Sequence, residues 1–456
     1  MNEIKKDVTI IGAGLTGLTM AYDLIKSGKS VAVIEKDSKP GGVIQTLKED
    51  DFILEAGPNT GVLSTPELVK LFDDLKGYCE LEVANEEAEK RLIWKNGSWK
   101  ALPSGLLSAV TTPLFSFKDK LRILGEPFRK RGTNPDESLA DMVRRRLGKS
   151  YLEYAVDPFI SGIYAGDPEK LITRFALPKL YNLEQNYGSF IKGAIQKKKE
   201  LKTELEKRVT KKVFSVKGGL QNLIHALARG ITSENIFFNC QQTEITNLNN
   251  NFLVKTQHTG EQLLIHSEKV VTTSGSYTLP DLFPSFEKQL WKVIETMNYA
   301  GVTQVVLGFK NWQGKSIQAF GGLVPSKEKK DILGILFPSS IFKGRAPENG
   351  ALLSIFLGGI KKPHLIEMSE EQIIEIAKSE VQKTLQTKTE PDLIKIFKYK
   401  YAIPQYDILT EPKLAAIQKI EKNYPGLVLA GNIRDGIGMA DRVKQAKNIA
   451  NQIIDE

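Results

Sequence analysis

The sequence is poor in the residues that bind metals and form disulfides. Its 456 residues include two cysteines, Cys79 and Cys240, and only four histidines. The cysteines are far apart and show no CxxC spacing, and the histidines are scattered. A disulfide framework and a zinc site are therefore both disfavoured. This composition fits a protein of a reducing, cytoplasmic compartment.

Long apolar runs are also missing. No run approaches the roughly 18 residues that a membrane-spanning helix requires, and residues 1–7 lead directly into a strand pattern. We therefore expect neither a secretory signal nor a transmembrane anchor. Hydrophobic residues nevertheless make up 41% of the chain, which is enough for a large core divided among two or three domains.

The net charge of +9 favours an anionic partner but does not choose among a membrane surface, an anionic substrate and a nucleic acid. The basic runs 197–199 and 211–212 alternate with Glu200, Glu204 and Glu206 in a helix-like pattern, which is typical of a solvated face. No aromatic residues interleave with them, so nucleic acid is not an expected partner.

The first motif is a βαβ unit that predicts a dinucleotide site. A β-branched strand at 8–11 leads into the GxGxxG motif 12–17, a helix pattern runs to Gly28, and a second strand at 31–34 ends in Glu35. In this unit the glycines allow a tight turn and a close approach of the pyrophosphate, and the helix N-terminus faces the phosphates. Glu35 is placed to bind a ribose diol and would repel a 2′-phosphate, so NADP is disfavoured.

Three further segments favour FAD over NAD. Lys39, Pro40 and the glycine pair 41–42 follow the ribose-binding position, and Glu55 to Pro58 follow a strand at 52–54. Near the C-terminus a strand at 427–430 leads into a glycine-rich turn and a helix that begins near Met439, whose N-terminus suits the flavin pyrimidine edge. The segment 270–275 ends a strand without a second GxGxxG, so a separate NAD(P)H site is not expected.

These segments resemble the flavin amine oxidase superfamily, and further motifs are similar to one family within it, the protoporphyrinogen oxidases. The superfamily resemblance lies in Gly12–Gly17, Lys39–Thr46, Glu55–Pro58 and Leu429–Gly438. The family resemblance lies in Arg91–Trp94, Ala101–Leu106, Asp157–Pro168, Pro178–Tyr181, Glu184–Gln185, Phe320–Pro325, Leu357–Gly359 and Ile403–Tyr406, and it covers nearly the whole chain.

The resemblance implies an α/β fold of three parts. They are a Rossmann-like FAD-binding domain that is discontinuous in sequence (1–75, 213–270 and 415–456), a mixed-sheet substrate-binding domain (76–94 and 271–414), and a helical membrane-associated domain (95–212). It also implies a peripheral position on the cytoplasmic side of a membrane, and a homodimer is compatible with it.

The implied activity is the oxygen-dependent oxidation of protoporphyrinogen IX to protoporphyrin IX in heme biosynthesis, in three steps. Flavin N5 accepts the hydride and dioxygen or another acceptor reoxidises the flavin, so we assign no catalytic side chain and no metal. No cysteine lies beside the C-terminal motif, which implies non-covalent FAD. The expected cofactor-binding residues are Gly12, Ala13, Gly14, Leu15, Thr16, Gly17, Glu35, Lys36, Lys39, Gly41, Gly42, Val43, Gly57, Pro58, Asn59, Thr60, Thr243, Asn432, Ile437, Gly438 and Met439.

The resemblance also implies five substrate-binding residues. Arg91 matches a position that meets a propionate, although an ion pair with Glu87 or Glu89 is an alternative. The apolar residues Phe320, Leu323 and Phe356 match positions that sandwich the macrocycle, where the alternative is ordinary core. Gly162 matches a glycine that faces the substrate, with a plain turn as its alternative.

The chain departs from the family pattern in two places. Lys39 stands where the family more often has arginine, and residues 440–442 read Ala-Asp-Arg in place of a common Asp-Cys-Ile. A short apolar stretch also leaves two interpretations open, a membrane interface or helical-domain core. Its members are Leu102, Leu106, Leu107, Val110, Leu114 and Phe115.

Other functions remain open. Coproporphyrinogen III oxidase activity needs the same fold, and the single basic anchor Arg91 favours the less carboxylated substrate. An amine oxidase, a carotenoid desaturase and a flavin-bound scaffold protein without turnover are also compatible with the fold that the motifs predict.

Overall fold

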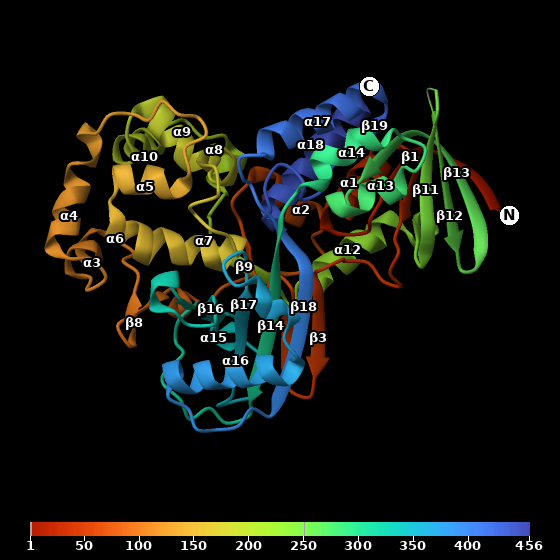
Figure 1. Ribbon diagram of the computed structural model, residues 1–456. Coiled ribbons are helices and arrows are strands. Elements are labelled where there is room, and N and C mark those ends of the chain that lie inside the picture. Colours follow the sequence, from red (N-terminus) through yellow and green to blue (C-terminus); the bar gives the residue numbers. More distant parts are fainter. Residues whose placement is uncertain (1, 250) are drawn as a thin grey trace.

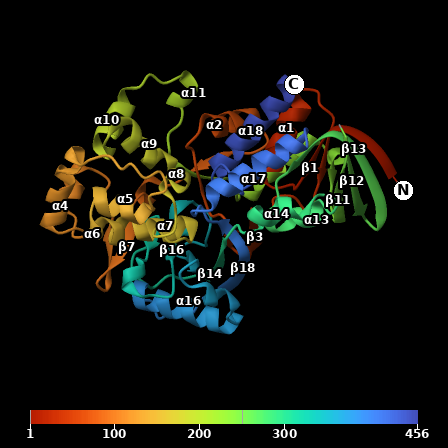
Figure 2. The same cartoon turned by 45° about the horizontal axis from the view of Figure 1, so that its top comes forward.

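The chain folds around two sheets, with a group of helices attached to one side (Figure 1). The computed structural model describes residues 2–249 and 251–456. The first sheet and its helices lie beside both termini, the second sheet lies below them in this view, and the helices of residues 106–207 extend to the left. Figure 2 shows the same three parts from a direction turned by 45°.

The first sheet has the order β10-β2-β1-β13-β12-β11, with β19 paired to β13. Strands β10, β2, β1, β13 and β19 pair in parallel, whereas β11, β12 and β13 form an antiparallel meander. The bounds are β1 Asn2–Ile11, β2 Val31–Ile34, β10 Ile236–Phe237, β11 Cys240–Leu248, β12 Asn251–His258, β13 Glu261–Thr272 and β19 Leu427–Leu429.

Both faces of this sheet are covered by helices, because alternate side chains of its strands point into two different cores. Val31 and Val33 of β2 pack into one core, and Ala32 and Ile34 pack into the other. The first core contains α1 (Leu15–Lys26), α2 (Pro66–Asp74), α12 (Gln221–Ile231) and α18 (Met439–Asp455), and the second contains α13 (Leu279–Leu282), α14 (Lys288–Glu295) and α17 (Thr410–Asn423).

The second sheet is mixed and has the order β18-β14-β17-β16-β15-β7-β8. Its pairs are antiparallel except β15 with β7, which is parallel. The bounds are β7 Arg91–Lys95, β8 Ser98–Ala101, β14 Tyr299–Phe309, β15 Gly321–Leu323, β16 Gly334–Leu336, β17 Ala351–Gly358 and β18 Leu393–Pro404. Helix α16 (Glu370–Leu385) packs on one face of the sheet through Ile373, Ala377 and Val381, which leaves the other face for the site.

The remaining elements join and surround these layers. The helical part contains α3 Leu106–Thr111, α4 Phe117–Leu124, η2 Glu126–Phe128, α5 Leu139–Arg146, α6 Lys149–Tyr151, η3 Leu152–Val156, α7 Asp157–Tyr164, α8 Thr173–Ala176, α9 Pro178–Tyr187, α10 Phe190–Lys199 and α11 Glu204–Lys207. Short elements elsewhere are β3 Gln45–Glu49, β4 Phe52–Ala56, β5 Gly61–Val62, β6 Leu81–Val83, β9 Val213–Val216, η1 Glu86–Ala88, η4 Ser233–Asn235, η5 Ser276–Thr278, η6 Ser326–Glu328, α15 Pro338–Ile341 and η7 Pro363–Glu367.

Most local expectations match these elements, and the charged stretch differs. Helix α18 begins at Met439, and β2 ends immediately before Glu35. The expected helix-like stretch of residues 197–212 is broken: α10 ends at Lys199, α11 covers only four residues, and Lys211 has a φ of 58°. Because Lys211 lies in the left-handed region of backbone space, a helix cannot continue through it.

The apolar residues between 102 and 115 differ in exposure, so some fit helical-domain core and others fit a membrane interface. Leu114 and Phe115 are buried and pack against Ile93 and Tyr154. Leu107 and Val110 are 81% and 70% exposed. The side chain of Leu106 lies outside the described residues. Among the residues that the structure describes, no helix combines the length and the apolarity that crossing a membrane requires.

Candidate flavin and substrate site

The glycine-rich turn between β1 and α1 leaves room for a phosphate. A Cβ built on Gly14 would meet no atom within 4 Å, whereas one on Gly17 would lie 2.0 Å from the Gly12 carbonyl oxygen. Gly17 thus permits the close packing of helix and turn, and Gly14 keeps the N-terminus of α1 open. Leu15 and Thr16 are buried in the first turn of α1.

Glu35 points back toward this turn from the end of β2. Its two carboxylate oxygens accept hydrogen bonds from the backbone N–H of Ala13 at 2.7 Å and of Asp37 at 3.0 Å. These bonds fix the carboxylate beside the turn, where it retains acceptor capacity for a ribose diol. The Glu35 carboxylate, as a hydrogen-bond acceptor, therefore fits the ribose in the adenosine half of FAD.

The second glycine pair lies against the first motif. The Gly41 N–H donates to the Ala13 carbonyl at 2.9 Å, and a Cβ on Gly42 would lie 3.9 Å from Gly14. Next to the pair, Val43 is 56% exposed, which is unusual for a valine between two ordered segments and fits contact with a bound ring or pyrophosphate. Lys36 and Lys39 are exposed on the same loop.

The loop that follows β4 is held by the second sheet. Gln304 of β14 accepts a hydrogen bond from the Gly57 N–H at 2.9 Å and donates to the Glu55 carbonyl at 2.8 Å. Ser354 of β17 donates to the Asn59 side chain at 2.8 Å. Loop residues 57–60, including Pro58 and Thr60, therefore lie at the junction between the two sheets.

Two ionisable groups border this junction. Burial raises the pKa of Glu55 above its usual range, against hydrogen bonds from the Thr46 hydroxyl and the Leu220 N–H and the charge of Arg345. Burial also raises the pKa of Tyr399 to about 12. The Tyr399 hydroxyl lies 3.6 Å from the position that a Cβ on Gly57 would take. Both groups thus border the loop expected to contact the flavin.

The C-terminal glycine turn is fixed by side chains from two directions. The Gly431 N–H donates to Gln445 at 2.9 Å, and Arg442 donates to the carbonyls of Gly431 and Arg434. On the other side, the Tyr406 hydroxyl accepts a hydrogen bond from the Gly436 N–H at 2.9 Å.

Beyond this turn, α18 presents its N-terminus. Gly438 is exposed, Met439 is buried, and Asn432 and Ile437 are half-buried along the turn. The Gly438 N–H donates to Asp441 at 3.1 Å, so the unusual aspartate caps the helix itself. Thr243 lies at the irregular pairing of β11 with β12, where its hydroxyl lies 2.9 Å from that of Thr256. The same strand begins beside the expected ribose site, since the Cys240 N–H donates to the Glu35 carbonyl at 2.9 Å.

The predicted sandwich residues meet on the face of the second sheet opposite α16. Leu323, Gly334 and Phe356 are directly paired across β15, β16 and β17, and Gln304 of β14 continues the same row. Because Gln304 also binds Gly57, this row begins beneath the expected flavin loop and leads away from it.

Helix α7 packs against this face of the sheet. A Cβ on Gly162 would lie 2.4 Å from the Cδ2 atom of Leu323, so only glycine allows Leu323 its position there. Gly162 is itself exposed, as is Ile163 beside it. The structure thus places Gly162 against Leu323, in the sheet row that also contains Phe356, and we call this part of the sheet the predicted substrate face.

Arg91 and Phe320 lie near the start of β15, before Leu323 in the direction of the strand. The Arg91 guanidinium lies 5.5 Å from the centroid of the Phe320 ring, and Arg91 pairs with Gly321 across the two parallel strands. Among the described residues no carboxylate lies within 4.0 Å of Arg91. The alternative ion pair with Glu87 or Glu89 is therefore not formed, and Arg91 is exposed and able to bind an anion.

Several supporting side chains were not predicted. Gln304 is, with Thr303, one of two neighbouring polar residues in an otherwise apolar run, which is a usable signal, because such a residue must find buried partners. Tyr406 lies within the motif 403–406 that carried the resemblance. Ser354, Tyr399 and Arg442 have no comparable sequence signal, since their roles depend on neighbours far away in the chain.

Residues 15–454 match the model of the flavin containing amine oxidoreductases. The chain belongs to this family. It is an FAD-dependent oxidoreductase, and the glycine turn, Glu35 and the open N-terminus of α1 fit that cofactor.

The similar proteins cover nearly the whole chain. The mitochondrial protoporphyrinogen oxidase of Nicotiana tabacum is 30% identical, with 98% of this chain and 95% of the relative covered. Protoporphyrinogen oxidase 2 of Arabidopsis thaliana is 28% identical over 98% and 94%. Coproporphyrinogen III oxidase of Bacillus subtilis is 26% identical over 98% and 97%.

A solved structure confirms the fold. A crystal structure from Exiguobacterium sp. 255-15 has a TM-score of 0.81 at 23% identity, with 98% of each chain covered. The expected α/β fold with a mixed second sheet is thus confirmed. The resemblance to the protoporphyrinogen oxidases is confirmed as well.

Proposed function

We propose that the protein oxidises protoporphyrinogen IX to protoporphyrin IX with dioxygen as electron acceptor. The observation that carries the proposal is the predicted substrate face, where Leu323 and Phe356 offer apolar walls in one row against Gly162. Arg91 is level with Gly321, two residues before Leu323, and Gln304 of the same row binds the expected flavin loop. A flat, apolar and anionic macrocycle suits such walls and such an anchor.

The residues of the chain supply binding and orientation. Bound FAD supplies a two-electron acceptor for hydride. Arg91 holds a propionate by charge-assisted hydrogen bonds, and Leu323 and Phe356 hold the ring plane. The Gln304 and Ser354 bonds keep residues 57–59 in place, so that the saturated bridge carbon is presented at a constant position.

The test is anaerobic mixing of the yellow protein with protoporphyrinogen IX. We expect the flavin absorption to bleach, and porphyrin fluorescence to rise above the uncatalysed rate once air is admitted. Arg91→Ala should raise KM by about 10- to 100-fold, because a hydrogen bond to a charged group is lost. Arg91→Lys should retain part of the binding, and Arg208→Ala, on a remote surface ion pair, should change nothing.

Failure to bleach would contradict the proposal. Bleaching by a polyamine or a carotenoid precursor instead would favour the amine oxidase or desaturase, and FAD binding without reduction by any of them would favour a scaffold role. A second candidate is oxidation of coproporphyrinogen III, which the Bacillus subtilis relative favours. Initial rates on both porphyrinogens decide between the two.

The helical part also supports a proposal of peripheral membrane binding. Figure 1 shows α3 and α4 at its outer end. Exposed apolar side chains gather on α3, α4 and η2, namely Leu107, Val110, Phe117, Leu121, Leu124 and Phe128. Lys118, Lys120 and Arg122 lie among them in sequence, as expected for contact with an anionic lipid surface.

Sedimentation with vesicles containing anionic lipid tests this surface. Phe117→Ser combined with Phe128→Ser should leave the protein in the supernatant at a salt concentration that retains the wild type on the vesicles. Equal sedimentation of both proteins would contradict the proposal. The matched control is Tyr277→Ser, which removes a 46% exposed aromatic ring on a different part of the surface.

A further inference from the structure

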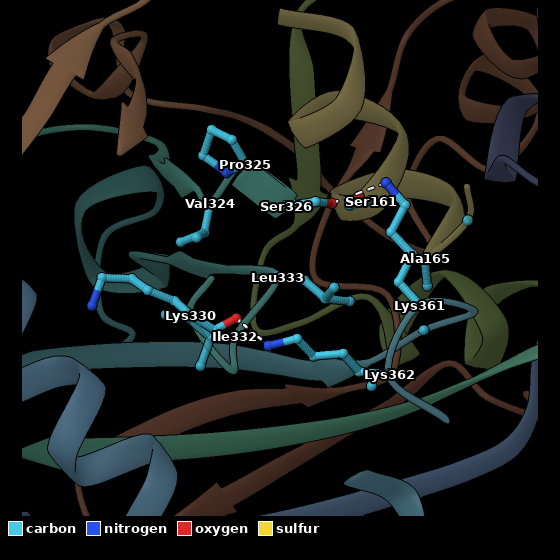
Figure 3. A pocket seen from close by; sticks show the side chains of 13 residues that line it. Ser161, Ala165, Val324, Pro325, Ser326, Lys330, Ile332, Leu333, Lys361 and Lys362 are labelled. Atoms are coloured by element: carbon cyan, nitrogen blue, oxygen red, sulfur yellow. Dashed lines mark hydrogen bonds between the residues drawn. The ribbon is translucent and has the colours of Figure 1, made fainter. Parts of the chain in front are cut away.

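A cavity of about 170 Å³ lies beyond the predicted substrate face, on the side of Leu323 that is further along the strand from Arg91. Its walls come from the residues that directly follow Leu323, precede Gly334 and follow Phe356, and from α7 next to Gly162 (Figure 3). The principal lining residues are Ser161, Ala165, Val324, Ile332, Leu333 and Gly359. The cavity therefore continues the predicted substrate face beyond its last row.

The distance along the sheet from Arg91 to this cavity is comparable with the size of a tetrapyrrole. Arg91 is level with Gly321, and the cavity wall at Pro325 lies four residues further along the chain. At roughly 3.3 Å per residue the separation is about 13 Å, comparable with the width of a macrocycle with its side chains. A propionate on Arg91 thus directs the opposite edge of the ring toward the cavity.

That opposite edge is where the two candidate substrates differ. Protoporphyrinogen IX carries two vinyl groups there, and coproporphyrinogen III carries two further propionates. We propose that the cavity receives an uncharged substituent of this edge and thereby selects protoporphyrinogen over coproporphyrinogen. This inference rests on the proposed function and adds the determinant of its substrate choice.

The charges around the cavity favour the uncharged group. Lys361 contacts Asp157 and lies 3.5 Å from Asp167, while Lys362 lies 2.6 Å from Asp331. The third rim lysine, Lys330, lies 2.7 Å from Glu380. Figure 3 shows the Lys361 amine reaching Ser326 and the Lys362 amine reaching the backbone of Lys330. The ammonium groups of these three lysines are thus paired with four carboxylates. A propionate that entered the cavity would therefore meet no unpaired lysine among them.

The inner wall reinforces this preference. Val324, Ile332, Leu333 and Ala165 offer apolar surface to a vinyl group. The Ser161 hydroxyl is buried and has no hydrogen-bond partner among the described residues. One hydroxyl satisfies only a small part of the hydrogen bonding that a carboxylate loses on leaving water, so coproporphyrinogen should be disfavoured about 10- to 100-fold in kcat/KM.

Two variants test the proposal with both porphyrinogens. Ser161→Leu fills the cavity from a helix, and we expect the KM for protoporphyrinogen to rise about 10-fold, as for loss of a subsite that binds a small apolar group. Asp157→Asn combined with Asp167→Asn removes both carboxylates from Lys361, and the ratio of kcat/KM for coproporphyrinogen over protoporphyrinogen should rise about 10-fold as that cation becomes available. FAD content and melting temperature verify that each variant is folded.

The control is Glu169→Gln, which releases Arg144 on the surface and should leave the ratio unchanged. An unchanged ratio in the double variant of Asp157 and Asp167, or an unchanged KM in Ser161→Leu, would overturn the inference while leaving the proposed function standing. A wild-type preference for coproporphyrinogen that Lys361→Met abolishes would also overturn it, because the cavity would then seat a carboxylate. Flavin that neither porphyrinogen reduces would reject the proposed function itself.

Discussion

At the scale of single residues, the site depends on close approaches that only particular side chains permit. Gly162 is the clearest case, because α7 and β15 meet there with no room for a methyl group. Tyr406 is a second case, since its hydroxyl joins the turn 431–438 to the core of the helical part. Both residues act on the ligands through geometry.

Gly162→Ala should impair turnover more than stability. The added Cβ displaces the flexible end of the Leu323 side chain on the predicted substrate face, which changes the surface offered to a flat substrate. We expect a KM at least about 10-fold higher with a loss of stability below about 1 kcal/mol. Steady-state kinetics and thermal melting measure the two effects.

The double variant Gly162→Ala with Leu323→Ala provides the check, because the shortened side chain makes room for the new methyl group. Partial recovery of KM is expected. If the double variant is no better than Gly162→Ala alone, steric displacement of Leu323 is not the cause. Gly105→Ala is the control, since a Cβ there meets nothing within 4 Å.

Tyr406→Phe should loosen the C-terminal turn. The Gly436 N–H would lose its partner, at a cost of about 1–3 kcal/mol, and FAD should be released more easily. Equilibrium dialysis against FAD and urea unfolding measure both effects. Unchanged FAD affinity together with unchanged stability would contradict the assigned role.

The pH dependence of Tyr406 follows from its burial. Burial raises the pKa of Tyr406 to about 12, from an ordinary value of 10.0. A raised pKa means that the folded protein keeps the proton more tightly than the unfolded chain does. The wild type should therefore lose stability between pH 10 and about pH 12, and Tyr406→Phe should lose less over the same interval. Melting temperatures across this range measure the difference.

At the scale of elements, the helical part is organised around a buried ion pair. Arg146 of α5 donates to Glu126 of η2, and both side chains have no exposed surface. Glu126 also accepts hydrogen bonds from the Ser189 hydroxyl and the Phe190 N–H at the start of α10. One carboxylate therefore joins three elements of the part that carries the exposed apolar surface.

Glu126→Gln should destabilise the helical part by about 1–3 kcal/mol, because Arg146 would keep Glu184 at 3.1 Å but lose its other buried counter-charge, and the hydrogen bonds from α10 would lose a charged acceptor. Glu169→Gln, which breaks a surface pair with Arg144, should change stability by about 0–1 kcal/mol. Urea unfolding of both variants gives the comparison, and equal effects would refute the distinction between the two pairs.

Acid should weaken the same cluster. Burial opposes the charge of Glu126 most strongly, but hydrogen bonds from Ser189, the Phe190 N–H, Arg146 and the Ile191 N–H together hold the pKa below its usual 4.5. A lowered pKa contributes stability that is present above pH 4.5 and is lost as the pH falls through the folded-state value. Glu126→Gln should lose less stability than the wild type as the pH falls, because glutamine does not titrate.

At the scale of the whole molecule, the two sheets meet through the expected flavin loop and the C-terminal turn. Hydrogen bonds from Gln304 and Ser354 fix the loop, and Arg345 joins Glu55 to Glu82 and Ser215. The expected cofactor site thus lies where the parts of the chain join, so FAD should stabilise the molecule as a whole.

Removal of FAD should lower the melting temperature. A ligand that binds only the folded state stabilises it by about 2.7 kcal/mol at a concentration 100 times its Kd. Calorimetry of the apoprotein with increasing FAD should show a progressive rise in melting temperature. A melting temperature that does not depend on FAD would place the cofactor outside the folded core, contrary to a site at the junction of the two sheets.

The sequence alone was sufficient for the nucleotide motif and the family. The GxGxxG turn, β2 and Glu35 follow from local periodicity and glycine positions, which act over a few residues. The resemblance supplied Arg91, Gly162 and Leu323, and the structure places Gly162 against Leu323 with Arg91 level with Gly321, two residues before Leu323. Their substrate contacts remain predictions.

Tertiary structure alone decided how these segments are joined. Tyr406 meets Gly436 and Gln304 meets Gly57 across 30 and 247 residues of chain, and no local pattern encodes such partners. The cavity beyond Leu323 likewise arises from four segments that only the sheet register brings together. Local sequence sets the conformation of a few residues, whereas hydrogen bonds and cavities between distant segments depend on how every intervening element packs.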